Sequence, residues 1–412
     1  MFRTRRHIED CFTDRASPLS NQIAYGVIRY YFHLKSVLDS LLDKPLPDKH
    51  RDVELLIISG LYSMTHLKRP AHASVNACVE ATVKLKKTWA KGLVNGVLRR
   101  YGREHDRLDQ DADEHIEARL NHPEWLIHEL EAAWPDAGTL FTVNNERAPM
   151  TLRVNETCTD RESVMAELAA AGIGSAAGRL VSTAVILERP VPVTDLPGFA
   201  EGRVSVQDEA PQLAPSLMNL APGQRVLDAC AAPGGKTCHL LEYCRNLQVT
   251  ALDRDRKRIH RISENLERLS LSADVLCEEL ESFNPTHPFD RILLDVPCSA
   301  TGIIRRHPDI KLLRDDEDIA KLSRTQLVLL KKAFELLSHD GELLYSTCSI
   351  LPRENDDIIT AFVAHQPDAE LIPVFHPAIT GNPATAGLQL LPESGGHDGF
   401  YYAVIRKSGV PG

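Results

Sequence analysis

The 412-residue sequence lacks the patterns that mark membrane and secreted proteins. It has no run of about 18 apolar residues, the length that a membrane-spanning helix needs. The basic start, Met1 to Arg6, has no apolar stretch behind it and therefore does not match a secretory signal. Glu9, Asp10 and Asp14 follow at once, which argues against a transit peptide. We therefore expect a cytoplasmic protein with no membrane partner.

Cysteine pairs and an overall basic charge are also missing. The nine cysteines are odd in number and contain no C-x-x-C pair, so the sequence predicts no disulfide framework and no metal site. The net charge of −10 by itself disfavours a nucleic-acid partner. However, residues 1–100 carry 17 Lys and Arg against 9 Asp and Glu, and the rest of the chain is acidic. Such a basic segment is typical of a module that faces nucleic acid, and it equally fits an ordinary solvated surface.

The spacing of apolar residues predicts three regions. Residues 1–135 repeat apolar side chains at helical intervals and predict a bundle of helices, with Ser17 or Ser20 capping an early one. Residues 136–205 mix short strands with a short helix, which predicts a small α+β connector. From 206 to 408, strands and helices alternate. That alternation is typical of a mostly parallel sheet with helices on both faces.

A glycine-rich loop joins the first strand of the third region to a helix. The segment Leu227–Thr237 reads LDACAAPGGKT. A Walker A phosphate loop would need glycine where the chain has Cys230, and the dinucleotide pattern G-x-G-x-x-G is absent. The loop therefore suits a nucleoside with a small charged tail, with a purely structural turn as the alternative. Asp253 ends the next strand, where an acidic residue commonly holds ribose hydroxyls, although such residues also cap helices.

Two cysteines stand at the ends of later strands. Cys298 lies in the segment DVPCS that starts at Asp295, and Cys348 lies in the segment TCS. A cysteine by itself is more often an inert core residue, but parallel strands bring their carboxyl ends to the edge where ligands bind. A thiolate there can add to carbon 6 of a cytosine and prepare carbon 5 for methylation, while the carboxylate of Asp295 holds or protonates ring nitrogen 3. The residues alone do not decide which thiol attacks and which assists release.

Together these motifs resemble those of the Fmu/Sun (Nop2/Sun-type) RNA cytosine-5 methyltransferases, and within that family the bacterial enzymes for small-subunit ribosomal RNA. The segments Arg305–Ile310 (RRHPDI) and Val206–Asp208 (VQD) also fit, and the resemblance covers nearly the whole chain. It implies a Rossmann-like class I methyltransferase domain, preceded by a NusB-like all-helical domain and the small connector. It also implies S-adenosyl-L-methionine as cofactor and an RNA, 16S ribosomal RNA, as substrate.

The resemblance further implies a role for each site residue. Cys348 would be the nucleophile and Cys298 would assist release of the product. The implied cofactor contacts are Cys230, Ala231, Ala232, Pro233, Gly234, Gly235, Lys236, Asp253, Glu279 and Asp295. Glu279 stands where the family usually has Asp, and Met1 falls near what is usually the third helix of the helical domain.

Two alternatives stay open at the level of sequence. One is a NusB-like RNA-binding or regulatory protein whose methyltransferase domain is weak or degenerate. The other is a methyltransferase for a different target, such as transfer RNA or a protein. The intact loop, both carboxylates and both thiols favour an active enzyme, and the basic N-terminal region favours folded RNA. We expect a monomer that binds RNA and not DNA.

Overall fold

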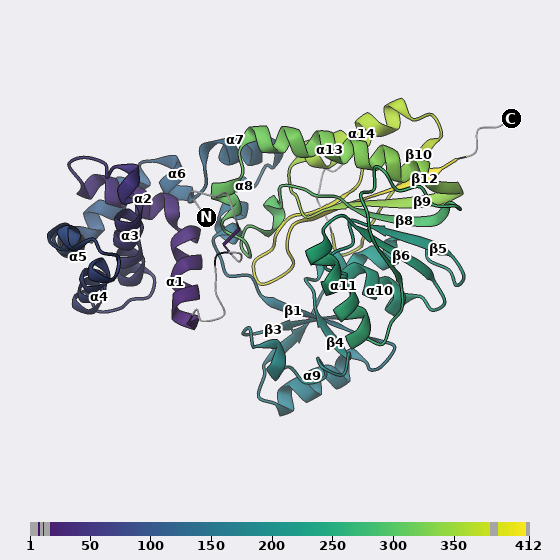
Figure 1. Ribbon diagram of the computed structural model, residues 1–412, viewed down its shortest axis with the longest axis horizontal. Coiled ribbons are helices and arrows are strands. Elements are labelled where there is room, and N and C mark those ends of the chain that lie inside the picture. The colour runs from purple at the N-terminus through teal and green to yellow at the C-terminus, as the bar shows by residue number, and fades with distance from the viewer. Residues whose placement is uncertain (1–6, 9–10, 12–16, 380–385, 409–412) are drawn as a thin grey trace. The chain divides into compact units, whose positions relative to one another are not determined.

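The computed structural model describes residues 7–8, 11, 17–379 and 386–408 and divides the chain into two compact units (Figure 1). The first unit holds the described residues up to Glu146 together with Ile304–Arg314. The second holds Arg147–Ile303 and the described residues from Asp315 onward. In the described ranges no helix has both the length and the apolar character that crossing a membrane requires.

The first unit is a bundle of helices. Its helices are α1 (Pro18–Arg29), α2 (Tyr31–Leu41), α3 (Arg51–Thr65), α4 (Ala71–Lys84), α5 (Lys91–Asp113), α6 (Ile116–Leu120), α7 (Glu124–Ala133), α8 (Ala137–Asn144) and α12 (Ile310–Leu313). The side chain of Ser17 accepts a hydrogen bond from the amide of Ser20 and caps α1, so the first of the two predicted caps is confirmed. Apolar residues three and four positions apart, such as Val53, Ile57 and Leu61 of α3, are fully buried in the bundle core.

Helix α12 joins this bundle although it lies far along the chain. The side-chain nitrogen of Lys311 is buried and donates hydrogen bonds to the carbonyl oxygens of Arg29 and Asn121, both at 2.7 Å, and to Oδ1 of Asn145 at 2.9 Å. Burial, followed by the charge of Arg29, lowers the pKa of Lys311 well below its usual value. Leu312 packs against the apolar core of the bundle. The segment is therefore an integral part of the helical unit.

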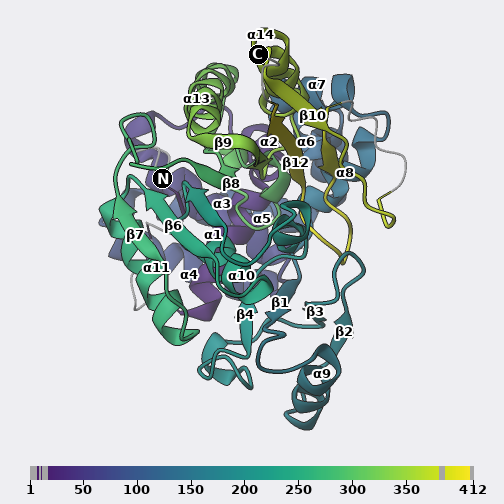
Figure 2. The ribbon, with the colours of Figure 1, turned by 90° about the vertical axis from the view of Figure 1, so that its right-hand side faces the viewer.

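The second unit begins with a small antiparallel sheet (Figure 2). Its elements are β1 (Met150–Val154), α9 (Arg161–Ala170), β2 (Ser175–Ala177), β3 (Ala184–Leu187) and β4 (Val204–Val206). The strand order is β2-β3-β1-β4. Apolar residues of α9 pack against the inward side chains of these strands. The predicted α+β character of this region is confirmed.

The remainder of the second unit forms an eight-stranded sheet with helices on both faces. The elements are β5 (Arg225–Ala229), α10 (Gly235–Tyr243), β6 (Gln248–Asp253), α11 (Arg256–Arg268), β7 (Asp274–Cys277), β8 (Phe289–Asp295), α13 (Asp316–Glu335), β9 (Leu337–Thr347), α14 (Asp356–His365), β10 (Ala369–Ile372), β11 (Leu388–Leu390) and β12 (Phe400–Lys407). Helices α13 and α14 cover one face, and α10 and α11 cover the other (Figure 1). The predicted fold class is confirmed.

The order of the strands determines where a ligand can bind. The main path is β10-β12-β9-β8-β5-β6-β7, with β5 to β9 parallel and β12 antiparallel to β9. From β5 the chain continues to β6 and β7 on one side, then returns to β8 on the other. This reversal creates a crevice outside the carboxyl ends of β5 and β8, the usual ligand position in open α/β sheets.

Candidate active site

Two residues with left-handed backbone shape the loop between β5 and α10. Cys230 has a φ of 63° and Gly234 a φ of 93°. The amide of Ala231 donates to the carbonyl of Leu252 at 3.0 Å, which ties the loop to β6. A Cβ at position 234 would lie 3.0 Å from the Cα of Ile262, so glycine also allows close packing against α11. The loop is therefore held in place by contacts with β6 and α11.

Asp253 is the last residue of β6, and its side chain is buried. Its Oδ2 accepts a hydrogen bond from the amide of Ala232 at 3.0 Å, and its Oδ1 accepts one from the amide of Asp255 at 2.9 Å. The guanidinium of Arg258 lies 4.0 Å from Oδ2. These two hydrogen bonds hold the carboxylate in one orientation. Each carboxylate oxygen has more than one acceptor site, so the group can still accept hydrogen bonds from a ligand.

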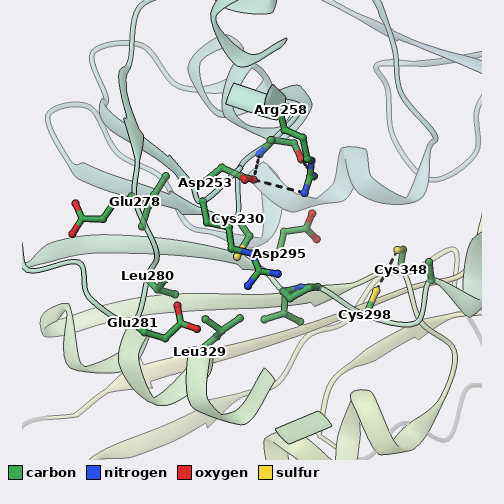
Figure 3. Close-up of a pocket in the computed structure, with 16 residues that line it drawn as sticks. Cys230, Asp253, Arg258, Glu278, Leu280, Glu281, Asp295, Cys298, Leu329 and Cys348 are labelled. Carbon is green, nitrogen blue, oxygen red and sulfur yellow. Dashed lines mark hydrogen bonds and ion pairs between the residues drawn. The ribbon is translucent and has the colours of Figure 1, made fainter. Parts of the chain in front are cut away.

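A cavity of about 240 Å³ opens at the carboxyl ends of these strands (Figure 3). Its apolar wall includes Leu252, Leu280, Val296 and Leu329. Its charged lining consists of the carboxylates Asp253, Glu278, Glu281 and Asp295 and the guanidiniums Arg254 and Arg258. The excess of carboxylates favours a ligand that carries positive charge.

Lys236 and Asp295 form an ion pair near the cavity. The Nζ of Lys236 lies 2.7 Å from Oδ2 of Asp295, and the hydroxyl of Ser346 donates to Oδ1 at 2.9 Å. Burial lowers the pKa of Lys236, but the charge of Asp295 and its hydrogen bond outweigh burial, so the pKa is raised overall. The pair therefore presents a fixed cation and a fixed anion side by side.

Cys298 and Cys348 face each other at the same edge of the sheet (Figure 3). Their sulfur atoms are 3.3 Å apart, and both are free cysteines that line the cavity. The hydrogen bond with Cys348, burial, and the charges of Cys348 and Glu354 raise the pKa of Cys298 well above its usual value. Either sulfur can be the hydrogen-bond donor, so the two side chains are in direct contact at the edge of the cavity.

The structure brings some predicted site residues to the cavity and leaves others outside its lining. Those that line it are Cys230, Ala232, Asp253, Asp295, Cys298 and Cys348. Ala231, Pro233, Gly234, Gly235 and Lys236 shape the loop without lining the cavity, and Lys236 reaches it through Asp295. Glu279 is exposed and does not line the cavity, whereas Glu278 and Glu281 on either side of it do.

Family models match the chain in three consecutive parts. The model "16S rRNA methyltransferase RsmB/F" matches residues 215–406, "Methyltr_RsmF/B-like, ferredoxin-like domain" matches 122–194, and "NusB family" matches 5–103. Ribosomal RNA small subunit methyltransferase B of Pseudomonas putida is 45% identical, over 97% of this chain and 92% of that protein. The protein of the same name from Vibrio cholerae is 44% identical, over 95% of this chain and 90% of that protein.

The chain belongs to the RsmB/F family of 16S rRNA methyltransferases. The NusB-like helical region and the Rossmann-like methyltransferase fold, both implied by the sequence motifs, are thereby confirmed. A solved structure titled PH0851 has the same fold, with a TM-score of 0.78 and 23% identity over 96% of this chain and 92% of that chain. A methyltransferase homologue from Pyrococcus horikoshii superimposes with a TM-score of 0.62 at 28% identity, over 71% of this chain and 97% of that chain.

One prominent residue of this RsmB/F-family site was not predicted from the sequence motifs. Glu354 is fully buried and accepts hydrogen bonds from Ser299 and Ser349, the residues that follow the two cysteines. Its partner Ser299 is 55 positions away along the chain, so no local pattern reveals the contact. The serines themselves stand in the two cysteine motifs, which was the available signal.

Proposed function

We propose that this RsmB/F-family enzyme methylates carbon 5 of a cytosine in 16S ribosomal RNA, using S-adenosyl-L-methionine and a covalent bond between Cys348 and carbon 6. The observation that carries the proposal is the pair of thiols 3.3 Å apart, beside Asp295 and at the edge of the cavity. Two thiols and a carboxylate are the groups that covalent activation of a cytosine requires.

The cavity fits S-adenosyl-L-methionine. Asp253 offers acceptors for ribose hydroxyls, and the apolar wall suits an adenine ring. The excess of carboxylates complements the positive sulfonium and ammonium groups. When bound, the cofactor supplies an electrophilic methyl group. Asp253 and the Cys230–Lys236 loop would hold it.

The two thiols have different tasks in this mechanism. Cys348, as the thiolate, adds to carbon 6, and the ring electrons shift so that carbon 5 becomes nucleophilic. The Lys236–Asp295 pair holds the ring nitrogen 3 side of the base while charge develops there. Release requires removal of the proton on carbon 5 and cleavage of the bond between Cys348 and carbon 6. Cys298 assists this step from its position 3.3 Å from the sulfur of Cys348, where its thiol can donate a proton to the departing Cys348 thiolate while a base takes the carbon 5 proton.

The RNA target is inferred from the relatives and from charge. The similar proteins from Pseudomonas putida and Vibrio cholerae are named for ribosomal RNA of the small subunit. Residues 1–100, which include most of the NusB match, carry a net charge of +8. A basic helical region favours binding to the phosphates of a folded RNA. Such a substrate implies that the enzyme acts in the cytoplasm.

The thiol roles can be tested with the purified chain, S-adenosyl-L-methionine and transcribed 16S RNA. We expect bisulfite sequencing to detect 5-methylcytosine with the native protein and none with Cys348→Ala, which should still bind the cofactor in calorimetry. Cys298→Ala should accumulate an RNA–protein adduct, seen as a shifted band on a denaturing gel. Cys158→Ala, at an exposed cysteine of the small sheet, is the matched control and should behave as the native protein.

Three results would contradict the proposal. Turnover by Cys348→Ala would exclude Cys348 as the nucleophile. Absence of an adduct with Cys298→Ala would remove its role in release. Methylation of transfer RNA but not of 16S RNA by the native protein would overturn the ribosomal target and leave the chemistry in place.

A further inference from the structure

The carboxylate of Glu354 contacts both cysteine loops at once. Its Oε1 accepts a hydrogen bond from the amide of Ser299 at 2.8 Å, and its Oε2 accepts one from the hydroxyl of Ser349 at 2.6 Å. Ser299 directly follows Cys298, and Ser349 directly follows Cys348. One side chain therefore links the backbone segments that carry the two thiols.

Two further donors complete the surroundings of this carboxylate. The hydroxyl of Ser299 donates to Oε2. The side-chain amide of Gln326 on α13 donates to Oε1 at 3.0 Å and also to the carbonyl of Pro297 at 3.0 Å. The loop of Cys298 is thus held at the residue before the thiol and at the residue after it. Each oxygen of Glu354 therefore accepts two hydrogen bonds.

The cost of burying this group argues for a function. Glu354, Ser299, Ser349 and Gln326 all have an exposed fraction of 0%. The four donors are neutral, and a carboxylate held in the interior by neutral donors alone is costly compared with an apolar side chain of similar size. Glu354 does not line the cavity, so it does not touch the reacting atoms directly.

We propose that Glu354 is a positioning residue that holds Cys298 and Cys348 at the distance at which one sulfur attacks the cytosine and the other assists release. This inference rests on the proposed covalent mechanism. The negative charge of Glu354 also contributes to the raised pKa of Cys298, after the hydrogen bond with Cys348 and burial. The network therefore holds the two sulfurs side by side and places a negative charge near Cys298.

The positioning role can be measured as the rate of covalent adduct formation. A 16S RNA transcript that carries 5-fluorocytidine is mixed with the full-length protein and S-adenosyl-L-methionine, because fluorine at carbon 5 prevents the final loss of a proton and preserves the adduct. Glu354→Ala frees both loops, and we expect the adduct to form about 100-fold more slowly, the effect of a displacement of roughly 1 Å. Glu354→Gln keeps the shape and most of the hydrogen bonds, so it should retain more of the rate than Glu354→Ala.

Ser323→Ala is the matched control for the adduct experiment. The Ser323 hydroxyl donates to the carbonyl of Arg353, next to Glu354, without contacting the carboxylate. This variant should form the adduct at the native rate. Calorimetric binding of S-adenosyl-L-methionine to each variant checks that the second unit remains folded.

The charge of Glu354 can be tested without RNA. In a Cys348→Ala background, alkylation of Cys298 by iodoacetamide is followed against pH by mass spectrometry. Adding Glu354→Gln removes a negative charge that opposes the thiolate, so the alkylation profile should shift to lower pH. A purely structural role would not produce that shift.

The outcomes separate the two proposals. If the native protein forms the adduct and Glu354→Ala forms it equally fast, the positioning role is wrong. If the alkylation profile does not move, the role of the charge is wrong. If the native protein itself forms no adduct and no 5-methylcytosine, the proposed function fails, and the alkylation profile still decides whether Glu354 acts on Cys298.

Discussion

At the scale of single residues, Asp228 is a buried and incompletely hydrogen-bonded carboxyl group at the start of the loop between β5 and α10. It lies in β5 and is 1% exposed. Its Oδ2 accepts a hydrogen bond from the hydroxyl of Thr237 at 2.5 Å, whereas its Oδ1 is buried without a hydrogen-bond partner among the described residues. Burial raises the pKa of Asp228 to about 7, although the hydrogen bond from Thr237 opposes the shift. The folded protein therefore holds a proton here that the unfolded chain releases at lower pH.

This raised pKa predicts how stability changes with pH. The pKa of Asp228 is about 7 in the folded state, against a reference value of 3.8. Its contribution to the free energy of unfolding is therefore fully present below pH 3.8 and is lost as the pH rises from 3.8 through 7. Over the whole range the loss is on the order of 4 kcal/mol at most. Asp228→Asn does not titrate. The melting temperature of Asp228→Asn minus that of the native protein should therefore increase between pH 5 and pH 8 in scanning calorimetry. A difference that stays constant over this range would contradict the raised pKa of Asp228.

At the scale of elements, the sequence predicts best where apolar periodicity is strong. The strands β1 and β3 fall within residues 136–205, where the sequence predicts short strands, and most of their side chains are buried. Helix α5 extends to Asp113, and its second half, residues 102–113, is rich in charged residues. Its second half is held by Arg107, which forms ion pairs with Glu104 and Asp111 one helical turn away on either side. Charge pairs of this kind leave no apolar pattern to detect.

The sequence predicts those residues of the candidate site that stand in local motifs, and not those that depend on distant contacts. The loop, Asp253, Asp295 and both thiols stand in motifs at strand ends, and parallel strands bring their ends together. Glu354 depends on partners 55 and 28 positions away, Ser299 and Gln326, which only the folded chain brings close. Tertiary contacts of this kind require the fold before they can be recognised.

A buried ion pair links the small sheet to α10, the helix that follows the glycine-rich loop. Arg153 of β1 is 1% exposed and donates to both carboxylate oxygens of Glu242 on α10, at 2.9 and 2.8 Å. It also donates to the carbonyl of Gly235, the first residue of α10, at 2.8 Å. The strand β1 thereby fixes the start of the helix next to the loop.

We expect removal of one partner to cost more than removal of both. Arg153→Met leaves the carboxylate of Glu242 buried without its cation and should lower the free energy of unfolding by about 3–5 kcal/mol. Arg153→Met with Glu242→Met removes both charges and should be less destabilised than the single variant. Urea denaturation monitored by circular dichroism compares them, with Arg161→Met, at the exposed pair with Glu162, as the control. Additive losses in the double variant would show that the pair is not coupled.

At the scale of the whole molecule, the chain does not complete one unit before it begins the other. It leaves the second unit after Ile303, contributes Ile304–Arg314 to the helical unit, and returns at Asp315. The helical unit therefore consists of two stretches of chain, and its core is completed only after much of the sheet of the second unit has been synthesised. Lys311 is the polar anchor of the second stretch, because its side-chain nitrogen donates to three acceptors from α1, α6 and α8 or the residues just beyond them.

Replacement of Lys311 should therefore destabilise the helical unit and leave the sheet intact. Lys311→Met keeps the length of the side chain but removes the hydrogen bonds to Arg29, Asn121 and Asn145, so we expect a loss of about 3 kcal/mol or more. Hydrogen exchange followed by mass spectrometry should show faster exchange in α1 and α6, with unchanged protection in β5 and β8. Lys321→Met, at an exposed lysine paired with Glu317, is the control and should leave both regions unchanged. Equal protection of α1 in the two variants would show that the Lys311 side chain does not anchor Ile304–Arg314 in the helical unit.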